Sequence, residues 1–93
     1  MIYEWDPKKA DANLRKHQVS FDEATGVFID PFALTFDDPD HSLEEPRFIT
    51  IGTSSKERIL FLSHVDRGED HIRLISTRPA TATEAYAYQE SRR

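Results

Sequence analysis

The chain has 93 residues, of which 38% are hydrophobic and 31% are charged, and its formal net charge is -5 at pH 7. This length and composition predict one domain over residues 1–93, and no segment approaches the ~20 apolar residues that a membrane span needs. The sequence has no cysteine, which excludes disulfides and thiolate metal sites, and its acidic balance disfavours an indiscriminate nucleic-acid binder, whose surface is usually basic.

The N-terminal residues predict a short strand followed by a helix. Residues 1–6 lack the basic and apolar regions of a signal peptide, so we expect a cytoplasmic protein. The alternation over residues 2–5 is typical of a strand at the edge of a sheet. Asp6, which precedes a proline, is a favourable helix cap, and we expect the helix over about residues 7–16 with Leu14 facing inward.

A second helix is predicted from a capping box. Ser20 is the expected N-cap, and Glu23, three residues further on, completes the box. The helix is expected over about residues 21–28 and ends at an Ile-Asp-Pro step, because the residue before a proline avoids helical geometry. Its apolar residues recur at helical spacing and predict an inward stripe of Phe21, Ala24, Val27 and Phe28.

The middle of the chain predicts a sheet. Apolar segments typical of strands cover residues 32–36, 47–52, 58–65 and 72–78. A polar loop over residues 37–42 follows the first of them, and tight turns join the other three into an antiparallel meander. The continuous apolar run within residues 58–65 predicts a strand that is covered on both faces.

The last helix is predicted over about residues 82–91. A second capping box, formed by Thr81 and Glu84, marks where it begins. The sequence shows no internal repeat, linker or low-complexity tract. Together the elements predict an α+β fold: two N-terminal helices, an antiparallel sheet meander and a C-terminal helix that closes onto the sheet.

Metal and cofactor motifs are absent from the sequence. The four histidines include no pair at the i, i+4 spacing of a helical zinc site, and the three glycines form no phosphate-binding loop. A metal site formed by Asp38, Asp40, His41 and Glu45 is a minor alternative, because an acidic, turn-rich loop explains these residues equally well. We therefore expect neither a metal ion nor a cofactor.

The segment over residues 72–78 is the one around which we expect the sheet to be organised. It carries Arg73 and Arg78, and a charged side chain seldom enters a sheet without a partner. One interpretation is a central strand whose end presents cations to an anionic substrate, since arginine holds phosphate by paired hydrogen bonds. The alternative is a half-exposed strand whose arginines lie on the surface.

A cationic site follows from the meander. Arg58 begins one strand and Arg78 ends its antiparallel neighbour, so the two guanidinium groups are expected within reach of one phosphate. Such a site can cleave RNA without a metal: a base removes the 2'-OH proton, arginines stabilise the phosphorane, and an acid protonates the leaving oxygen. His17 or Tyr88 is the expected proton-transfer group. Arg73 lies at an odd spacing from Arg78 and shares its face only if a bulge intervenes.

At these residues the chain resembles the BrnT toxins of bacterial type II toxin–antitoxin modules. The resemblance covers nearly the whole chain, through short pieces whose order and spacing together are specific. They comprise residues 4–9, 13–17, 19–24, 30–31, 40–41, 47–48, 51–52, 72–76 and 80–81, together with Ser54, Arg58 and Arg78.

The resemblance implies a ribonuclease toxin with a fold like that of the RelE toxins. It also implies a BrnA-like antitoxin with a ribbon-helix-helix DNA-binding domain, which inhibits the toxin and represses their shared operon. A dimeric antitoxin would give a hetero-oligomer with two copies of each chain, which meets operator DNA only through the antitoxin. The family's basic residues are carried over to Lys16, His17, Arg58 and Arg78 as candidate site residues, and Lys16, Arg73 and Tyr88 are the expected RNA contacts.

Two departures from the family pattern bear on activity. Glu57 stands where relatives usually have glycine, and Pro46 interrupts the usual acid-then-arginine run. The last helix also has Ala85, Ala87 and Gln89 where relatives tend to be basic. An alternative function is therefore an attenuated binding module, which pairs with the antitoxin to regulate their operon without cleaving RNA. A structural domain with no partner is a third possibility.

Overall fold

The computed structural model describes residues 1–41 and 45–92. Ser42, the last residue of the predicted polar loop, lies outside this part of the chain. The elements are β1 (Ile2–Glu4), α1 (Pro7–His17), α2 (Phe21–Ala24), the 3-10 helix η1 (Thr25–Ile29), β2 (Leu34–Asp37), the 3-10 helix η2 (Pro39–His41), β3 (Arg47–Thr53), β4 (Ile59–Asp66), β5 (His71–Pro79) and α3 (Ala82–Ser91). None of the described helices is long and apolar enough to cross a membrane.

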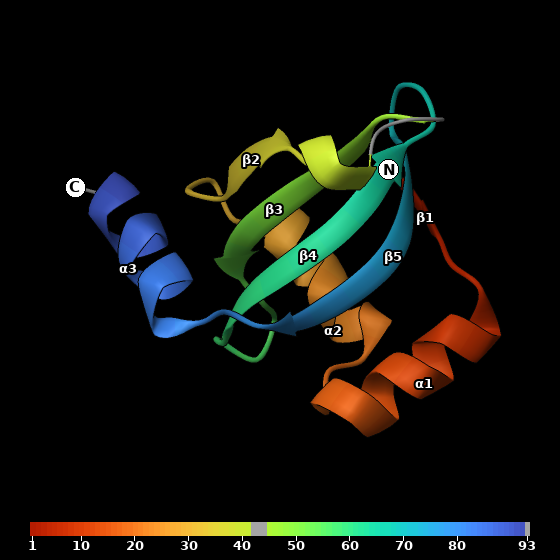
Figure 1. The fold of residues 1–93 in the computed structure, drawn as a ribbon, viewed down its shortest axis with the longest axis horizontal. Helices are drawn as coiled ribbons and strands as arrows, with labels where there is room; N and C mark the ends of the chain where they lie inside the picture. The colour runs from red at the N-terminus through yellow and green to blue at the C-terminus, as the bar shows by residue number, and fades with distance from the viewer. Residues whose placement is uncertain (42–44, 93) are drawn as a thin grey trace.

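The described strands form one sheet in the order β1-β5-β4-β3-β2 (Figure 1). The meander of β3, β4 and β5 is confirmed, and β2 also pairs antiparallel with β3. The prediction of an entirely antiparallel sheet is wrong, because β1 pairs parallel with the beginning of β5 and makes the sheet mixed. The segment over residues 72–78 was predicted as the central strand of the sheet. The central strand is instead β4, and β5, which contains this segment, lies next to it.

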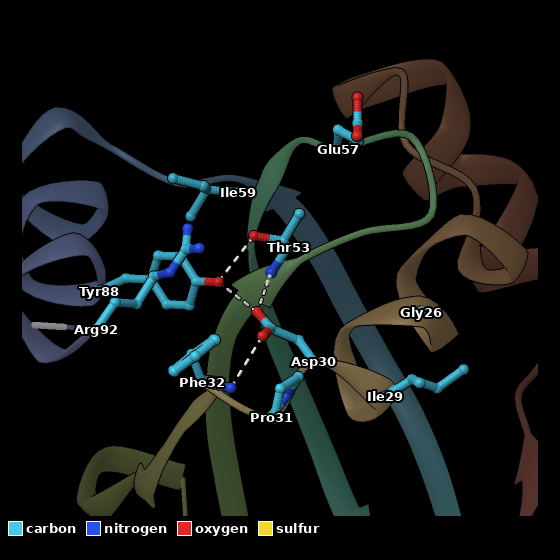
Figure 2. Close-up of a pocket in the computed structure, with 10 residues that line it drawn as sticks. All are labelled: Gly26, Ile29, Asp30, Pro31, Phe32, Thr53, Glu57, Ile59, Tyr88 and Arg92. Atoms are coloured by element: carbon cyan, nitrogen blue, oxygen red, sulfur yellow. Dashed lines mark hydrogen bonds between the residues drawn. The ribbon is translucent and has the colours of Figure 1, made fainter.

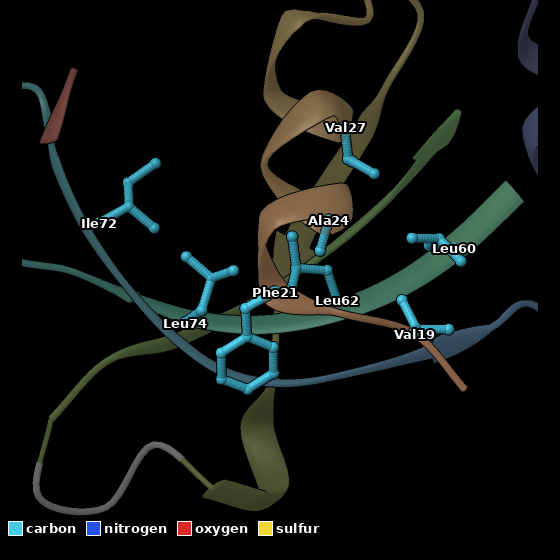
Figure 3. Packing of buried hydrophobic residues seen from close by; sticks show 8 residues of the cluster. All are labelled: Val19, Phe21, Ala24, Val27, Leu60, Leu62, Ile72 and Leu74. Atoms are coloured by element: carbon cyan, nitrogen blue, oxygen red, sulfur yellow. The ribbon is translucent and has the colours of Figure 1, made fainter. Parts of the chain in front are cut away.

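One face of the sheet packs against the N-terminal helices. In Figure 1, α2 crosses this face of the sheet, and Figure 3 shows the side chains between α2 and the strands. The predicted helix over residues 21–28 is an α-helix to Ala24 and continues as the 3-10 helix η1. Its predicted stripe is confirmed, since Phe28 packs against a core formed by Val19, Phe21, Ala24, Val27, Leu60, Leu62, Ile72 and Leu74.

Helix α1 is attached to the sheet by a buried amide rather than by the predicted leucine. Leu14 is exposed, and the inward residue is Asn13, which is 7% exposed. The Asn13 Nδ2 donates to the backbone oxygens of Val19 at 3.0 Å and Thr77 at 2.9 Å, and the Oδ1 accepts the Thr77 N–H at 3.0 Å. β1 pairs with only three residues at the beginning of β5, and the Asn13 amide binds the same strand further along, at Thr77. Leu14 was predicted to face inward from its spacing along the helix. That prediction was wrong, because α1 contacts backbone groups of Val19 and Thr77, which the Asn13 amide can bind and a leucine side chain cannot.

A bulge in β5 decides which way its arginines point. Ser63 pairs with Ser76, but the next residue of β4, His64, pairs with Leu74, so Ile75 is an extra residue in β5. Directly opposed residues of a sheet share a face. Arg73 opposes Val65 and Arg78 opposes Phe61, and both arginines therefore lie on the face away from α2 despite their odd spacing.

A buried histidine and its hydrogen bonds link β4, β3 and β2 on the face of the sheet that packs against η1. His64 is 2% exposed, and its Nδ1 lies 2.9 Å from the Asp66 carboxylate. The Nε2 lies 2.8 Å from the Thr50 hydroxyl, which is 2.8 Å from the Thr35 hydroxyl. Burial lowers the pKa of His64 below its ordinary value, and the Asp66 charge opposes this effect only in part. The imidazole is therefore neutral in the folded protein at neutral pH.

Acidification is expected to destabilise the fold through His64. The unfolded chain takes up a proton near the ordinary histidine pKa of about 6.5, whereas the folded chain, with its lowered pKa, does not. The unfolding free energy should therefore fall as the pH drops below about 6.5, with a slope of at most ~1.4 kcal/mol per pH unit for this proton. Urea unfolding between pH 7.5 and 5 measures the slope, and it should be smaller in His64→Gln. An identical slope in that variant would contradict the assignment.

Glu57, which stands where related toxins usually have glycine, lies in the turn between β3 and β4. The Glu57 N–H donates to the Ser54 oxygen at 2.9 Å, and Glu57 itself has φ 62. This left-handed conformation costs a residue with a Cβ roughly 1–2 kcal/mol, and glycine adopts it freely. We expect Glu57→Gly to raise the unfolding free energy by about 1 kcal/mol, measured by thermal and urea unfolding. The neighbouring Lys56→Gly, which relieves no positive φ, should give no gain.

Candidate functional site

Lys16 and His17 lie at the C-terminal end of α1, beside β5. Together with Lys9 they line a groove of about 210 Å³ whose other wall is Ile75 and Ser76 of β5. The basic residues are favourable here because the helix dipole places partial negative charge at this end. His17 is half-buried in the groove, whereas the Lys16 side chain is exposed. The structure thus brings these two predicted residues together at the edge of β5.

Arg78 lies two residues beyond Ser76 on the same strand. Its guanidinium carbon is 4.0 Å from the centre of the Phe61 ring, and Nη1 and Nη2 donate to the Glu84 carboxylate at 2.8 and 3.0 Å. These hydrogen bonds raise the pKa of Arg78 and lower that of Glu84. With Nη1 also donating to the Pro79 oxygen, the described contacts leave the Nε–H and one Nη2–H of Arg78. Two adjacent donors of this kind suit a phosphate.

Arg73 lies near the opposite end of β5 and has a carboxylate partner. In the sheet register it opposes Glu4 of β1, and its Nη1 is 4.0 Å from the Glu4 carboxylate. The same carboxylate lies 3.5 Å from Arg67 and 3.3 Å from His71. Arg73 and Arg78 thus lie on one half-exposed face, as the alternative interpretation of the strand expected, and each has an acidic partner. Binding of an anionic substrate by these cations stays a prediction.

Arg58 is not part of the same site as Arg78. The Arg58 Nε donates to the Glu23 carboxylate at 2.9 Å, and its Nη2 donates to the other Glu23 oxygen and to the Gln18 oxygen. Glu23 belongs to α2, under the core face of the sheet, whereas Arg78 covers Phe61 on the other face. The expectation that both guanidinium groups reach one phosphate is wrong, because strand ends that meet at one edge can still point to opposite faces.

Glu23 and Arg58 form a partly buried ion pair that joins α2 to the β3–β4 turn. The Ser54 hydroxyl also donates to Glu23, at 2.7 Å, and the Arg58 hydrogen bonds lower the pKa of Glu23. The capping box predicted for Ser20 and Glu23 is therefore only half formed. The Ser20 hydroxyl accepts the Glu23 N–H, but the Glu23 carboxylate binds Arg58 instead of the Ser20 backbone. Since Arg58 also holds the Gln18 oxygen, it fixes the residue that follows His17.

Tyr88 lies in a cavity of about 580 Å³ between α3 and the turn from η1 to β2 (Figure 2). Its hydroxyl donates to the Asp30 carboxylate and is 2.8 Å from the Thr53 hydroxyl. Burial raises the pKa of Tyr88, and the Asp30 bond adds to the effect. Burial also raises the pKa of Asp30, but hydrogen bonds from Tyr88, Thr53 and Phe32 outweigh it and leave this pKa below its ordinary value. Tyr88 is thus a poor proton donor or base.

Sequence reasoning missed the carboxylates that hold these groups. Glu23, Asp30 and Glu84 each had a simpler explanation as a capping or helix-stop residue, and their non-local partners leave no signal in a local pattern. Phe32 and Arg92, which border the Tyr88 cavity, were likewise not singled out. Within residues 1–41 and 45–92, no three histidine, aspartate or glutamate side chains gather in a way that could hold a metal ion.

Comparisons with known proteins identify the class first. Residues 5–84 match the family model described as "Ribonuclease toxin, BrnT, of type II toxin-antitoxin system", which places the chain among type II toxins. Since the match covers most of the sequence, the chain belongs to the BrnT family. No curated protein matches the chain. The chain is similar to the crystal structure of the Brucella abortus ribonuclease toxin BrnT, with a TM-score of 0.67 and 21% identity over 87% of this chain and 99% of that one.

Proposed function

We propose that this chain is a toxin that acts in the cytoplasm as a metal-independent endoribonuclease and arrests growth. Membership of a family of ribonuclease toxins supports the class of reaction. The observation that carries the proposal is the position of His17, in a groove at the edge of β5 and close along the strand to Arg78. We infer that His17, as the proton-transfer group, and Arg78, as the phosphate-binding group, act on one RNA strand that lies along this part of β5. We also propose that the fold is related to that of the RelE toxins.

The proposed roles follow from the contacts. His17 removes the 2'-OH proton, and Arg78 binds the phosphate through its remaining donors and stabilises the charge of the phosphorane. Protonated His17 or water then delivers a proton to the leaving 5' oxygen. Lys16 and Arg73 attract the RNA backbone, and Arg58 is a positioning residue that holds the helix end at Gln18.

Cleavage of purified RNA tests the proposal. The folded chain should cut single-stranded RNA in the presence of EDTA and should leave a 2'-deoxy version of the same oligonucleotide intact. His17→Ala should abolish cutting without unfolding the protein, whereas the exposed variant Lys8→Ala serves as the matched control. Cleavage that stops on chelation, or that continues on the 2'-deoxy strand, would exclude this chemistry.

The partner proposed for the toxin is an antitoxin. A type II toxin family implies such a partner; we infer that it is BrnA-like, carries a ribbon-helix-helix domain and contacts operator DNA, with two copies of each chain in the complex. Co-expression with the product of the adjacent gene, followed by measurement of the mass of the complex in solution, tests the stoichiometry.

A second candidate is the attenuated binding module. It is favoured by the ion pairs of Arg58 with Glu23 and Arg78 with Glu84, since these carboxylates compete with any phosphate. It predicts a stable complex with the antitoxin and no RNA cleavage by the isolated chain. Restored cleavage in Glu84→Gln would show that the carboxylate is what attenuates the site.

A further inference from the structure

The cavity beside α3 has the features of a binding site and is separate from the His17 groove. Its polar floor consists of the Asp30 carboxylate with the Tyr88 and Thr53 hydroxyls. Phe32, which is 46% exposed, forms one wall. The Arg92 guanidinium carbon lies 5.1 Å from the centre of the Phe32 ring and 5.7 Å from that of Tyr88 (Figure 2).

An exposed aromatic ring with a guanidinium group above it can stack against a flat aromatic ligand. Single-stranded RNA is bound in this way, with bases stacked on aromatic rings and arginine planes. A phosphate is disfavoured in the same cavity, because Glu57 borders it and Asp30 stays ionised on its floor. The charges therefore favour the base of a nucleotide over its backbone.

The Asp30 carboxylate gives the cavity a chemical preference. It accepts hydrogen bonds from the Phe32 N–H at 2.9 Å, from the Thr53 N–H at 2.9 Å and from the Tyr88 hydroxyl. A carboxylate has about four acceptor positions, so one remains for a ligand donor. Adenine, cytosine and guanine carry an exocyclic amino group that can donate to it. Uracil offers only its N3–H, which lies between two carbonyl oxygens that the carboxylate repels.

The cavity is one helical turn from the proposed phosphate contact. Glu84, which holds Arg78, and Tyr88, which forms the cavity floor, are four residues apart on α3. Such residues lie on one side of a helix, separated by a rise of about 6 Å. One nucleotide can therefore place its phosphate at Arg78 while its base enters the cavity.

We propose that this cavity is a base-binding subsite for single-stranded RNA that prefers amino-bearing bases to uracil. The subsite deepens the proposed ribonuclease function and rests on it for the identity of the ligand as RNA. It would set which nucleotide lies next to the bond that is cut.

Binding of cleavage-resistant RNA tests the subsite. Short 2'-O-methyl oligonucleotides of adenine, cytosine or uracil are titrated with the full chain, and fluorescence anisotropy gives the affinities. Adenine and cytosine oligonucleotides should bind about tenfold more tightly than uracil, and Phe32→Ala should weaken their binding about tenfold, as expected for one lost stacking partner. The matched control is Phe36→Ala, because Phe36 has a similar exposure of 45% and lies outside the cavity.

The outcomes separate the subsite from the proposed function. Unchanged binding in a folded Phe32→Ala, an equal loss in Phe36→Ala, or no discrimination against uracil would overturn the subsite, even if the chain cleaves RNA. Base-selective binding that depends on Phe32, in a chain that does not cleave RNA, would support the subsite and exclude the nuclease function.

Discussion

Replacing Arg78 with alanine is expected to lower the rate of RNA cleavage by about 100-fold to 1,000-fold, the usual effect of removing a donor that stabilises an oxyanion in the transition state. The reason is the set of contacts on the described side chain. Glu84 takes one donor from each terminal nitrogen of Arg78, which aligns the guanidinium group and leaves adjacent donors for a phosphate. Initial rates on a fluorogenic RNA oligonucleotide, in EDTA, measure the effect.

Two further variants show whether the loss is chemical. Arg78→Lys keeps the charge but not the planar fork, so its rate should lie between those of alanine and wild type. Arg67→Ala removes an exposed arginine of the turn between β4 and β5, and it should cleave at the wild-type rate. Circular dichroism verifies that each variant is folded. Full activity in a folded Arg78→Ala would remove the phosphate-binding role of this residue.

Asn13→Ala should produce the largest loss of stability of the alanine variants discussed, about 2–4 kcal/mol. The alanine leaves the Thr77 N–H and the oxygens of Thr77 and Val19 without the partner that they have in the wild type. All of these groups are buried, and a buried polar group without a partner costs about 1–3 kcal/mol. For a domain of this size, the midpoint of thermal unfolding should fall by roughly 10–25 °C.

The control for Asn13 comes from the same helix. Asp11 is exposed, and Asp11→Ala should change the unfolding free energy by no more than about 0.5 kcal/mol. Asn13→Asp retains the acceptor for the Thr77 N–H but loses both donors, and it places a charge beside two carbonyl oxygens, so it should be at least as damaging. A loss below about 0.5 kcal/mol in Asn13→Ala would show that water satisfies these groups.

Local signals in the sequence were sufficient for the elements themselves. The capping box at Thr81 is complete in the structure, and α3 has the predicted bounds, because caps act within one helical turn. The meander was predictable for a similar reason, since tight turns leave adjacent strands few ways to pair. The parallel pairing of β1 with β5 was not predictable, because it joins segments from opposite ends of the chain.

The candidate site was predictable only in its residue types. His17 lies beside Ser76 of β5, two residues from Arg78, but that position depends on α1 being bound to the strand through Asn13, a polar residue on a polar helix. Arg58 looked like a substrate ligand because its partner, Glu23, is distant in sequence and doubles as a helix-cap residue. Partners of this kind require coordinates in three dimensions.

The bulge at Ile75 changes how this chain should be compared with others. Because the extra residue is absorbed by the strand, a homologue that lacks it would carry its two arginines four residues apart and still present both on the same side. Sequence separation and spatial arrangement are thus uncoupled within β5. Pairwise alignments should permit a single gap at this point, and motif searches that fix the spacing between the arginines would overlook proteins with the same surface.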